Sequence, residues 1–167
     1  NSIRVVLVKP LTFMNESGVA VKKVMDYYRV TDPKRVVAIS DDINTLPGAL
    51  AIQDGGDLKS LLGQKGQESI ATILGTTGFI RFRLGVGRPA SGSPVTIPQW
   101  VLGPFSSEDK EMDLFYYLMG QAVQALFFFV QSNDLKQCRK KFAKSRSIPS
   151  RLIPVESLVS PVDVEGM

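Results

Sequence analysis

The most constraining feature of the chain is a short apolar run that ends at a proline and gives way to a helical pattern. Residues 3–8 (Ile-Arg-Val-Val-Leu-Val) are rich in β-branched residues and predict one buried β-strand. Pro10 has no N–H for a further ladder bond, so the strand ends there. From Val21 onward apolar residues recur at helical spacing. Asn15 is therefore predicted to lie in the loop between a strand and a helix. This is a common location for functional side chains in open α/β sheets.

Asn15 and Ser17 have a structural and a functional interpretation at this stage. Asn and Ser are among the commonest helix N-caps, so either residue is expected to accept a hydrogen bond from the first turn of the helix. The alternative is that Asn15 binds or acts on a substrate. Local spacing by itself favours the cap.

The rest of the pattern alternates between strands and helices. Residues 36–39 predict a central parallel strand that is buried on both faces, with Asp41 and Asp42 at its carboxyl end. A turn at 46–48 leads to a short strand, and residues 79–87 predict a half-exposed strand. Helices are expected over 63–74 and from a Ser106 N-cap, with Asp109 in a capping box, to about residue 130. This pattern predicts an α/β fold, with a mixed, mostly parallel sheet flanked by helices in one domain over residues 1–131.

Composition excludes several classes of chemistry. The chain has 167 residues, which is enough for one domain with a sizeable core. It contains no histidine and a single cysteine, Cys138, so the commonest general base and the commonest zinc ligand are absent. We therefore expect no metal site and no cofactor. We also expect no membrane partner, because the most apolar run, residues 122–130, is shorter than a bilayer span.

A basic segment follows the last predicted helix of the domain. The net charge of +4 and pI near 9.3 permit a polyanionic partner. Residues 132–167 are predicted to form a basic extension and an extended tail, and the stretch 136–151 holds seven Lys or Arg residues and no acidic residue. These cations form either the solvated face of a short helix or an arm that neutralises phosphates.

Four ordered segments carry a resemblance to a known family. Residues 9–18 (KPLTFMNESG) resemble K-P-x-T-(Y/F)-M-N-x-S-G of bacterial-type peptidyl-tRNA hydrolases. Residues 41–48 (DDINTLPG) are similar to the family's D-(D/E)-x-D-x-P-x-G, and residues 81–89 (RFRLGVGRP) to its R-x-R-(I/L)-G-(I/V)-G-R-P. Residues 101–106 (VLGPFS) resemble its V-L-G-x-F-S. Together they span roughly the first two-thirds of the chain and identify it as a divergent member of that family.

The resemblance implies an activity and two catalytic positions. The family cleaves the ester that joins a peptide to the 3′ end of tRNA, on a single α/β domain with a mixed sheet. Its members use a His polarised by an Asp to activate water, and Asn side chains to position substrate and stabilise charge. Asp41 matches the family Asp, and Asn15 matches the Asn of the M-N pair. Phe13 and Met14, which precede Asn15, are then expected to contact substrate.

Two departures from the family pattern concern the catalytic residues. The segment that carries the family's catalytic His, with its first strand and helix, has no counterpart in this sequence. The family's G-G-H-N-G motif aligns with residues 62–66, where Gln64 replaces the His and Lys65 replaces the substrate-contacting Asn. A lysine attracts phosphate, whereas an asparagine hydrogen-bonds a neutral group. The simpler explanation of Lys65 is a solvated loop lysine.

These observations predict a peptidyl-tRNA-hydrolase-like pseudoenzyme that binds tRNA, rRNA or other structured RNA. We expect it to act with protein partners in an organellar ribonucleoprotein, such as a mitochondrial ribosome or its assembly intermediate, with a cytoplasmic location as the alternative. An active hydrolase whose His lies on a preceding segment, and a structural protein-binding subunit, stay open as other functions. The residues expected to contact RNA are Lys65, Arg81, Arg83, Arg88, Arg139, Lys140, Lys141 and Lys144.

Overall fold

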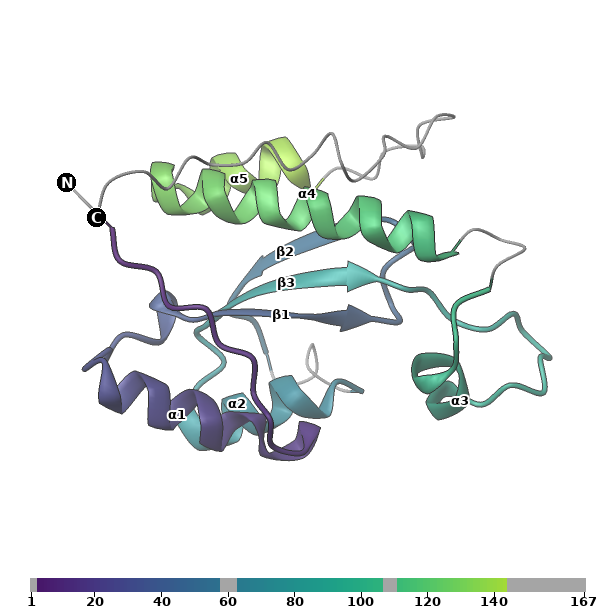
Figure 1. Ribbon diagram of the computed structural model, residues 1–167, viewed down its shortest axis with the longest axis horizontal. Coiled ribbons are helices and arrows are strands. Elements are labelled where there is room, and N and C mark those ends of the chain that lie inside the picture. The colour runs from purple at the N-terminus through teal and green to yellow at the C-terminus, as the bar shows by residue number, and fades with distance from the viewer. Residues whose placement is uncertain (1–2, 58–62, 107–110, 144–167) are drawn as a thin grey trace. The chain divides into compact units, whose positions relative to one another are not determined.

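The computed structural model describes residues 3–57, 63–106 and 111–143 of the chain. Within these residues three strands form one sheet in the order β1-β3-β2 (Figure 1). The strands are β1 (Val37–Asp42), β2 (Leu50–Asp54) and β3 (Ile80–Gly85). The helices are η1 (Met14–Glu16), α1 (Ser17–Tyr27), η2 (Pro33–Arg35), α2 (Lys65–Leu74), α3 (Ile97–Leu102), α4 (Glu111–Ser132) and α5 (Leu135–Phe142).

Hydrogen bonds at the two ends of the central strand β3 define a mixed sheet. The amides of Ile80 and Val86 donate to the carbonyls of Val36 and Asp42, so β3 runs parallel to β1. On the other side of β3, Gly85 donates to the carbonyl of Ala49 and Gly55 donates to the carbonyl of Phe79, so β2 runs antiparallel to β3. The predicted α/β fold with a mixed sheet and flanking helices is confirmed, with one parallel and one antiparallel pair among the described strands.

The chain divides into two compact units, which we describe separately. Unit 1 comprises Asn1–Ser40 and Ile52–Phe82, and unit 2 comprises Asp41–Ala51 and Arg83–Met167. The core of unit 1 consists of Ile70, Ala71 and Phe79, against which Val21 of α1 packs. This core buries the apolar faces of α1 and α2, as their helical spacing predicted.

A glycine sets the approach of α1 to α2 in unit 1. A Cβ built on Gly18 would lie 2.2 Å from the carbonyl oxygen of Ser69, so any other residue would force the two helices apart. The Gly18 amide instead donates to the Ser69 hydroxyl at 3.0 Å. One turn earlier, Met14 of η1 lies over Gly66 of α2. The N-terminal ends of α1 and α2 therefore lie side by side.

The long helix α4 forms the core of unit 2 together with α5. Leu118, Ala122 and Ala125 of α4 are buried, and the fully buried Cys138 of α5 donates its thiol to the carbonyl of Ala125 at 3.2 Å. Burial raises the pKa of the Cys138 thiol above its ordinary value of 9.0, and the charge of Lys141 opposes this shift. The helix predicted to end near residue 130 is confirmed, and it continues to Ser132.

The first predicted strand is wrong for the described chain. Residues 3–8 belong to no strand or helix, and Leu7 is 84% exposed. A strand needs a neighbour to complete its ladder of hydrogen bonds, and the sheet consists only of β1, β3 and β2 among the described residues. High β-propensity by itself therefore did not produce a strand here.

The burial of two strands is also reversed from the prediction. β1, expected at the centre, is an edge of the described sheet, and its Ile39 is 48% exposed. β3, expected to be half-exposed, lies between the other two strands and buries all of its residues except Arg83, which is half-buried. The alternation of charged and apolar residues in β3 predicted one solvent-exposed face. Arg81 breaks that rule because its guanidinium is buried and donates to the carbonyl of Gly55.

Capping differs from the prediction at helix α1. The N-cap of α1 is Glu16, without a side-chain cap, and the Ser17 hydroxyl donates back to the carbonyl of Met14 at 2.8 Å. The capping interpretation of Asn15 and Ser17 is therefore wrong. The segment that contains Trp100 forms α3, which begins with a Thr96–Gln99 capping box. The predicted capping-box residue Asp109 lies outside the described residues.

Helix α4 is long and apolar enough to cross a membrane by length and composition alone. Its buried residues are Leu118, Ala122 and Ala125, so only a small part of the helix is buried. The prediction considered only residues 122–130 and so underestimated the apolar length. One such helix is weak evidence for a membrane, because packing helices of soluble proteins have the same composition.

Candidate functional site

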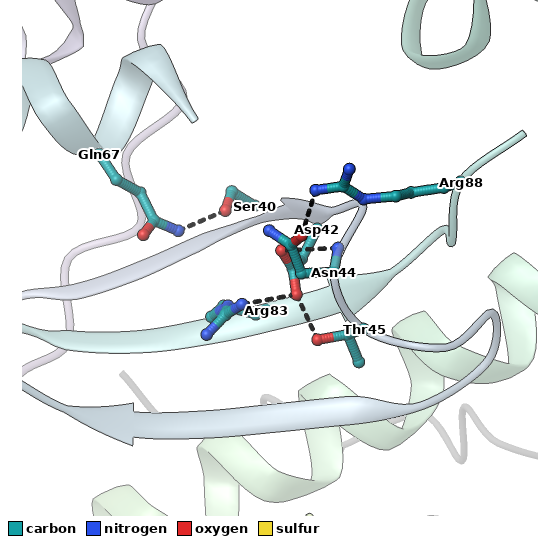
Figure 2. Close-up of polar contacts among 7 residues, drawn as sticks. All are labelled: Ser40, Asp42, Asn44, Thr45, Gln67, Arg83 and Arg88. Atoms are coloured by element: carbon teal, nitrogen blue, oxygen red, sulfur yellow. Dashed lines mark hydrogen bonds and ion pairs between the residues drawn. The ribbon is translucent and has the colours of Figure 1, made fainter. Parts of the chain in front are cut away.

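The carboxyl end of β1 carries a compact polar cluster in unit 2. Asp42, the last residue of the strand, is buried and pairs with the guanidinium of Arg83 on β3 at 2.8 Å (Figure 2). The same carboxylate accepts hydrogen bonds from the Thr45 hydroxyl and from the amide of Asn44 at 3.2 Å. A buried carboxylate needs such partners to replace the hydrogen bonds that water would make. The cluster therefore fixes the loop that follows β1.

A second arginine continues the cluster toward solvent. The exposed Arg88 donates to the side-chain oxygen of Asn44 (Figure 2). Asp41, the position that matches the family's Asp, precedes Asp42 and is half-buried. The predicted location of Asp41 and Asp42 at the carboxyl end of a strand is confirmed. Arg83 and Arg88, predicted as separate RNA contacts, belong to one cluster with Asp42 and Asn44.

The other candidate residues lie in unit 1, at the adjacent starts of α1 and α2. Phe13, Met14 and Asn15 are all exposed, with Phe13 as the N-cap of the η1 turn. Lys65 is the first residue of α2 and is also exposed. The contact of Met14 with Gly66, the residue after Lys65, brings these side chains to one end of the unit. Asn15 and Lys65 therefore share a surface that has two helix N-termini behind it.

The residue before Lys65 stabilises the start of helix α2. Gln64 is the N-cap of α2, and its side chain accepts a hydrogen bond from the amide of Gly66 at 3.0 Å. A capping glutamine at the position of the family's His holds Lys65 in the first helical turn. The helix dipole favours anions at this end. Lys65 adds a full positive charge to it.

Two polar residues of unit 1 were missed by the sequence analysis. Gln67 of α2 is buried and donates its side-chain amide to the hydroxyl of Ser40 on β1 (Figure 2). The bond ties the helix that carries Lys65 to the strand that leads to Asp41. A glutamine on the apolar side of a helix, three residues before Ile70, was the available signal.

One predicted RNA contact is corrected by its burial. Arg81 is fully buried, and its guanidinium donates to the carbonyl of Gly55 and lies 5.9 Å from the centre of the Phe79 ring. A phosphate cannot reach a guanidinium with no exposed surface. Arg81 is a structural residue that holds the end of β2 in unit 1, and we remove it from the RNA-binding set.

The basic helix α5 presents its cations to solvent. Arg139, Lys140 and Lys141 are exposed in its last turn, and the Lys141 ammonium lies 4.7 Å from the centre of the Phe128 ring. The prediction left open a solvated face or a phosphate-binding arm, and exposure is compatible with both. Lys144 lies outside the described residues. Among the described residues no group of three or more His, Cys, Asp or Glu side chains is placed to hold a metal ion.

The described residues define an α/β protein with a mixed sheet, an acid–arginine cluster at a strand end and an exposed lysine at paired helix starts. The family model described as peptidyl-tRNA hydrolase matches residues 1–150. The chain therefore belongs to the peptidyl-tRNA hydrolase family, which confirms the predicted resemblance.

Individual relatives support the assignment over most of the chain. The peptidyl-tRNA hydrolase of Moorella thermoacetica is 37% identical over 139 residues, which cover 83% of this chain and 69% of that protein. The peptidyl-tRNA hydrolase of Lactococcus lactis subsp. cremoris is 36% identical over 144 residues, with 85% and 71% covered. The crystal structure of the Acinetobacter baumannii enzyme matches with a TM-score of 0.67 and 27% identity. That match covers 80% of this chain and 63% of the solved chain.

Proposed function

We propose that this chain binds the tRNA part of peptidyl-tRNA, or a similar structured RNA, and that the 167-residue sequence by itself does not hydrolyse the ester. The observation that carries the proposal is Lys65. It stands at the family's Asn position, is exposed, and begins a helix whose N-terminus lies beside that of α1. A cation and two positive helix ends favour a phosphate group.

The chemical half of the proposal rests on composition. Ester hydrolysis requires a group that activates water, and the family's histidine has no counterpart among residues that include no histidine at all. Asp41 matches the residue that polarises this His in the family, so it has no imidazole of this sequence to act on. Loss of a general base typically lowers the rate about 10²–10⁴-fold.

An active hydrolase is the second candidate. Asp41 and Asn15, which match two of the family's catalytic positions, are both present, and the relatives at 36–37% identity are named as hydrolases. In this alternative a histidine from outside the given sequence completes the site. Organellar location and membership of a ribonucleoprotein are further parts of our proposal, and cell fractionation followed by RNase treatment of the sedimenting fraction tests both.

The decisive experiment measures binding and turnover on the same substrate. We expect the 167-residue chain to bind a peptidyl-tRNA and to release no peptide beyond the uncatalysed background. Lys65→Asn should weaken binding without restoring turnover, and it should reduce the slope of log K against log salt by about 0.7–0.9 if one phosphate contact is lost. Lys34→Asn, which removes an exposed lysine of η2, serves as the matched control.

Each half of the proposal has its own contradicting result. Turnover near that of an ordinary relative would establish the active hydrolase instead. Binding that is unchanged by Lys65→Asn would leave Lys65 as a solvated lysine and remove the observation on which RNA binding rests.

A further inference from the structure

The two arginines of the polar cluster in unit 2 have partners of different charge. Arg83 pairs with the carboxylate of Asp42, which neutralises its charge. Arg88 instead donates to the side-chain oxygen of Asn44, and it has no carboxylate partner among the described residues (Figure 2). Arg88 and Asn44 are both exposed. The guanidinium of Arg88 therefore presents a full positive charge at the surface of unit 2.

Asn44 departs from the family pattern, and this departure changes the charge beside Arg88. The pattern D-(D/E)-x-D-x-P-x-G has an acidic residue at the position where this chain has Asn44. An aspartate there would form an ion pair with Arg88 and would repel an approaching anion. The asparagine accepts the same hydrogen bond without a charge, and its amide nitrogen adds two N–H donors. Arg88 and Asn44 together form a set of donors that suits a phosphate oxygen.

The backbone next to Arg88 is fixed by the contacts of Gly87. The Gly87 amide donates to the carbonyl of Thr45 at 3.1 Å, and its carbonyl accepts a hydrogen bond from the indole of Trp100 at 3.0 Å. Gly87 has a φ of 65°, and a Cβ built on it would lie 2.8 Å from Cγ of Pro47, so the two loops pack without room for a side chain. Donors on a fixed backbone lose little conformational entropy when an anion binds.

The exposure of this pair favours a phosphate of a nucleic acid over a small free anion. Sites for small molecules are usually concave and bury most of the ligand, whereas Arg88 and Asn44 are open to solvent. The planar fork of an arginine binds two oxygens of a backbone phosphate at once. Unit 2 also contains the exposed cations of α5, which are expected to bind further phosphates of the same polyanion.

We propose that Arg88 and Asn44 bind one backbone phosphate of the RNA, and that Asn44, in place of an aspartate, leaves the charge of Arg88 available for this contact. The inference rests on the proposed RNA binding, but it uses residues of unit 2, whereas Lys65 belongs to unit 1. The two departures from the family pattern have the same direction. Lysine in place of asparagine and asparagine in place of aspartate each make the charge more positive by one.

The test restores the acidic residue of the family pattern. Asn44→Asp should lower the affinity of the 167-residue chain for deacylated tRNA about tenfold, which is the effect of losing one charge-assisted contact. It should also reduce the slope of log K against log salt by about 0.7–0.9. Fluorescence anisotropy at several salt concentrations measures both. Gln124→Glu makes the same charge change at an exposed position of α4 and should alter neither quantity.

A double-mutant cycle separates the lost contact from general repulsion of the RNA. In an Arg88→Gln chain the phosphate contact is already absent, so the further change Asn44→Asp should alter affinity by about twofold or less. Asn44→Asp by itself should not lower the melting temperature, because it adds an exposed ion pair. Circular dichroism confirms that each variant is folded. If Asn44→Asp is not, Arg88→Gln by itself should show the same losses of affinity and slope.

Three results would overturn this inference. The first is tRNA binding that Lys65→Asn weakens but that Asn44→Asp and Arg88→Gln leave unchanged, which would keep the proposed function and remove only this site. The second is an equal loss from Asn44→Asp with and without Arg88, which indicates general repulsion. The third is binding of inorganic phosphate at Arg88, seen by NMR, with no effect of Asn44→Asp on tRNA binding, which assigns the site to a free anion. A native chain that binds no tRNA would instead contradict the proposed function itself.

Discussion

The arginines of β3 and the cations of α5 look alike in the sequence but differ in the structure. Arg81 and Arg83 alternate along a central strand, where one is fully buried on a backbone carbonyl and the other is paired with Asp42. Arg139 and Lys140 lie on a short helix with their side chains in solvent. A cation inside a sheet is held by internal acceptors. An exposed cation can instead neutralise a phosphate of a nucleic acid, which releases the counterions condensed on that nucleic acid. RNA binding is therefore expected from α5 and not from β3.

The largest expected effect is on folding, from Arg81→Ala. The substitution empties a fully buried position and leaves the carbonyl of Gly55 without this donor, so the free energy of unfolding should fall by about 3 kcal/mol. Urea denaturation followed by circular dichroism measures it. Arg139→Ala, at an exposed position, should change stability by about 0.5 kcal/mol or less. Equal effects would remove the distinction between the two regions.

The next effect concerns the acid that pairs with the second β3 arginine. Asp42→Asn keeps the shape of the side chain but removes its charge, and should destabilise the protein by about 1–2 kcal/mol. A double-mutant cycle with Arg83→Gln separates the ion pair from the other bonds, and a coupling energy near zero would contradict our account. Asp54→Asn, an exposed carboxylate at the end of β2, is the control.

The effect on RNA binding sharpens the other side of the comparison. Changing Arg139, Lys140 and Lys141 together to Gln should lower affinity for a structured RNA at least tenfold near 0.1 M salt, and should flatten the slope of log K against log salt by about 2. The matched control changes three exposed cations of unit 1, Lys23, Lys34 and Arg35, to Gln. An unchanged slope in the α5 variant would show that this helix face is solvated and does not bind RNA.

The smallest effect tests how α5 is anchored. Burial raises the pKa of the Cys138 thiol, so the unfolded chain ionises this group first as the pH rises. The stability that this pKa difference contributes is complete below the ordinary thiol pKa and is lost as the pH rises through the folded pKa. Thermal unfolding at pH 7 and pH 10, for the native chain and for Cys138→Ala, measures it. We expect a larger alkaline loss in the native chain, and parallel losses would show that the thiol contributes nothing.

The sequence predicted most of the local structure because its signals act over short range. The period of apolar residues located α1, α2 and α4, and the run before Asp41 located β1, since each depends on neighbours within one element. Four motifs with fixed spacing identified the family. The location of Asp41 and Asp42 at a strand end followed from the same local pattern.

Tertiary structure decided the order of the strands and whether each charged side chain is buried or exposed. No local pattern distinguishes an edge strand from a central one, so β1 and β3 exchanged their expected burial, and residues 3–8 formed no strand without a partner. The same limit applies to Arg81, whose acceptor Gly55 is distant in sequence. The fold brings that carbonyl to the buried guanidinium, and the order of residues along the chain does not reveal this contact.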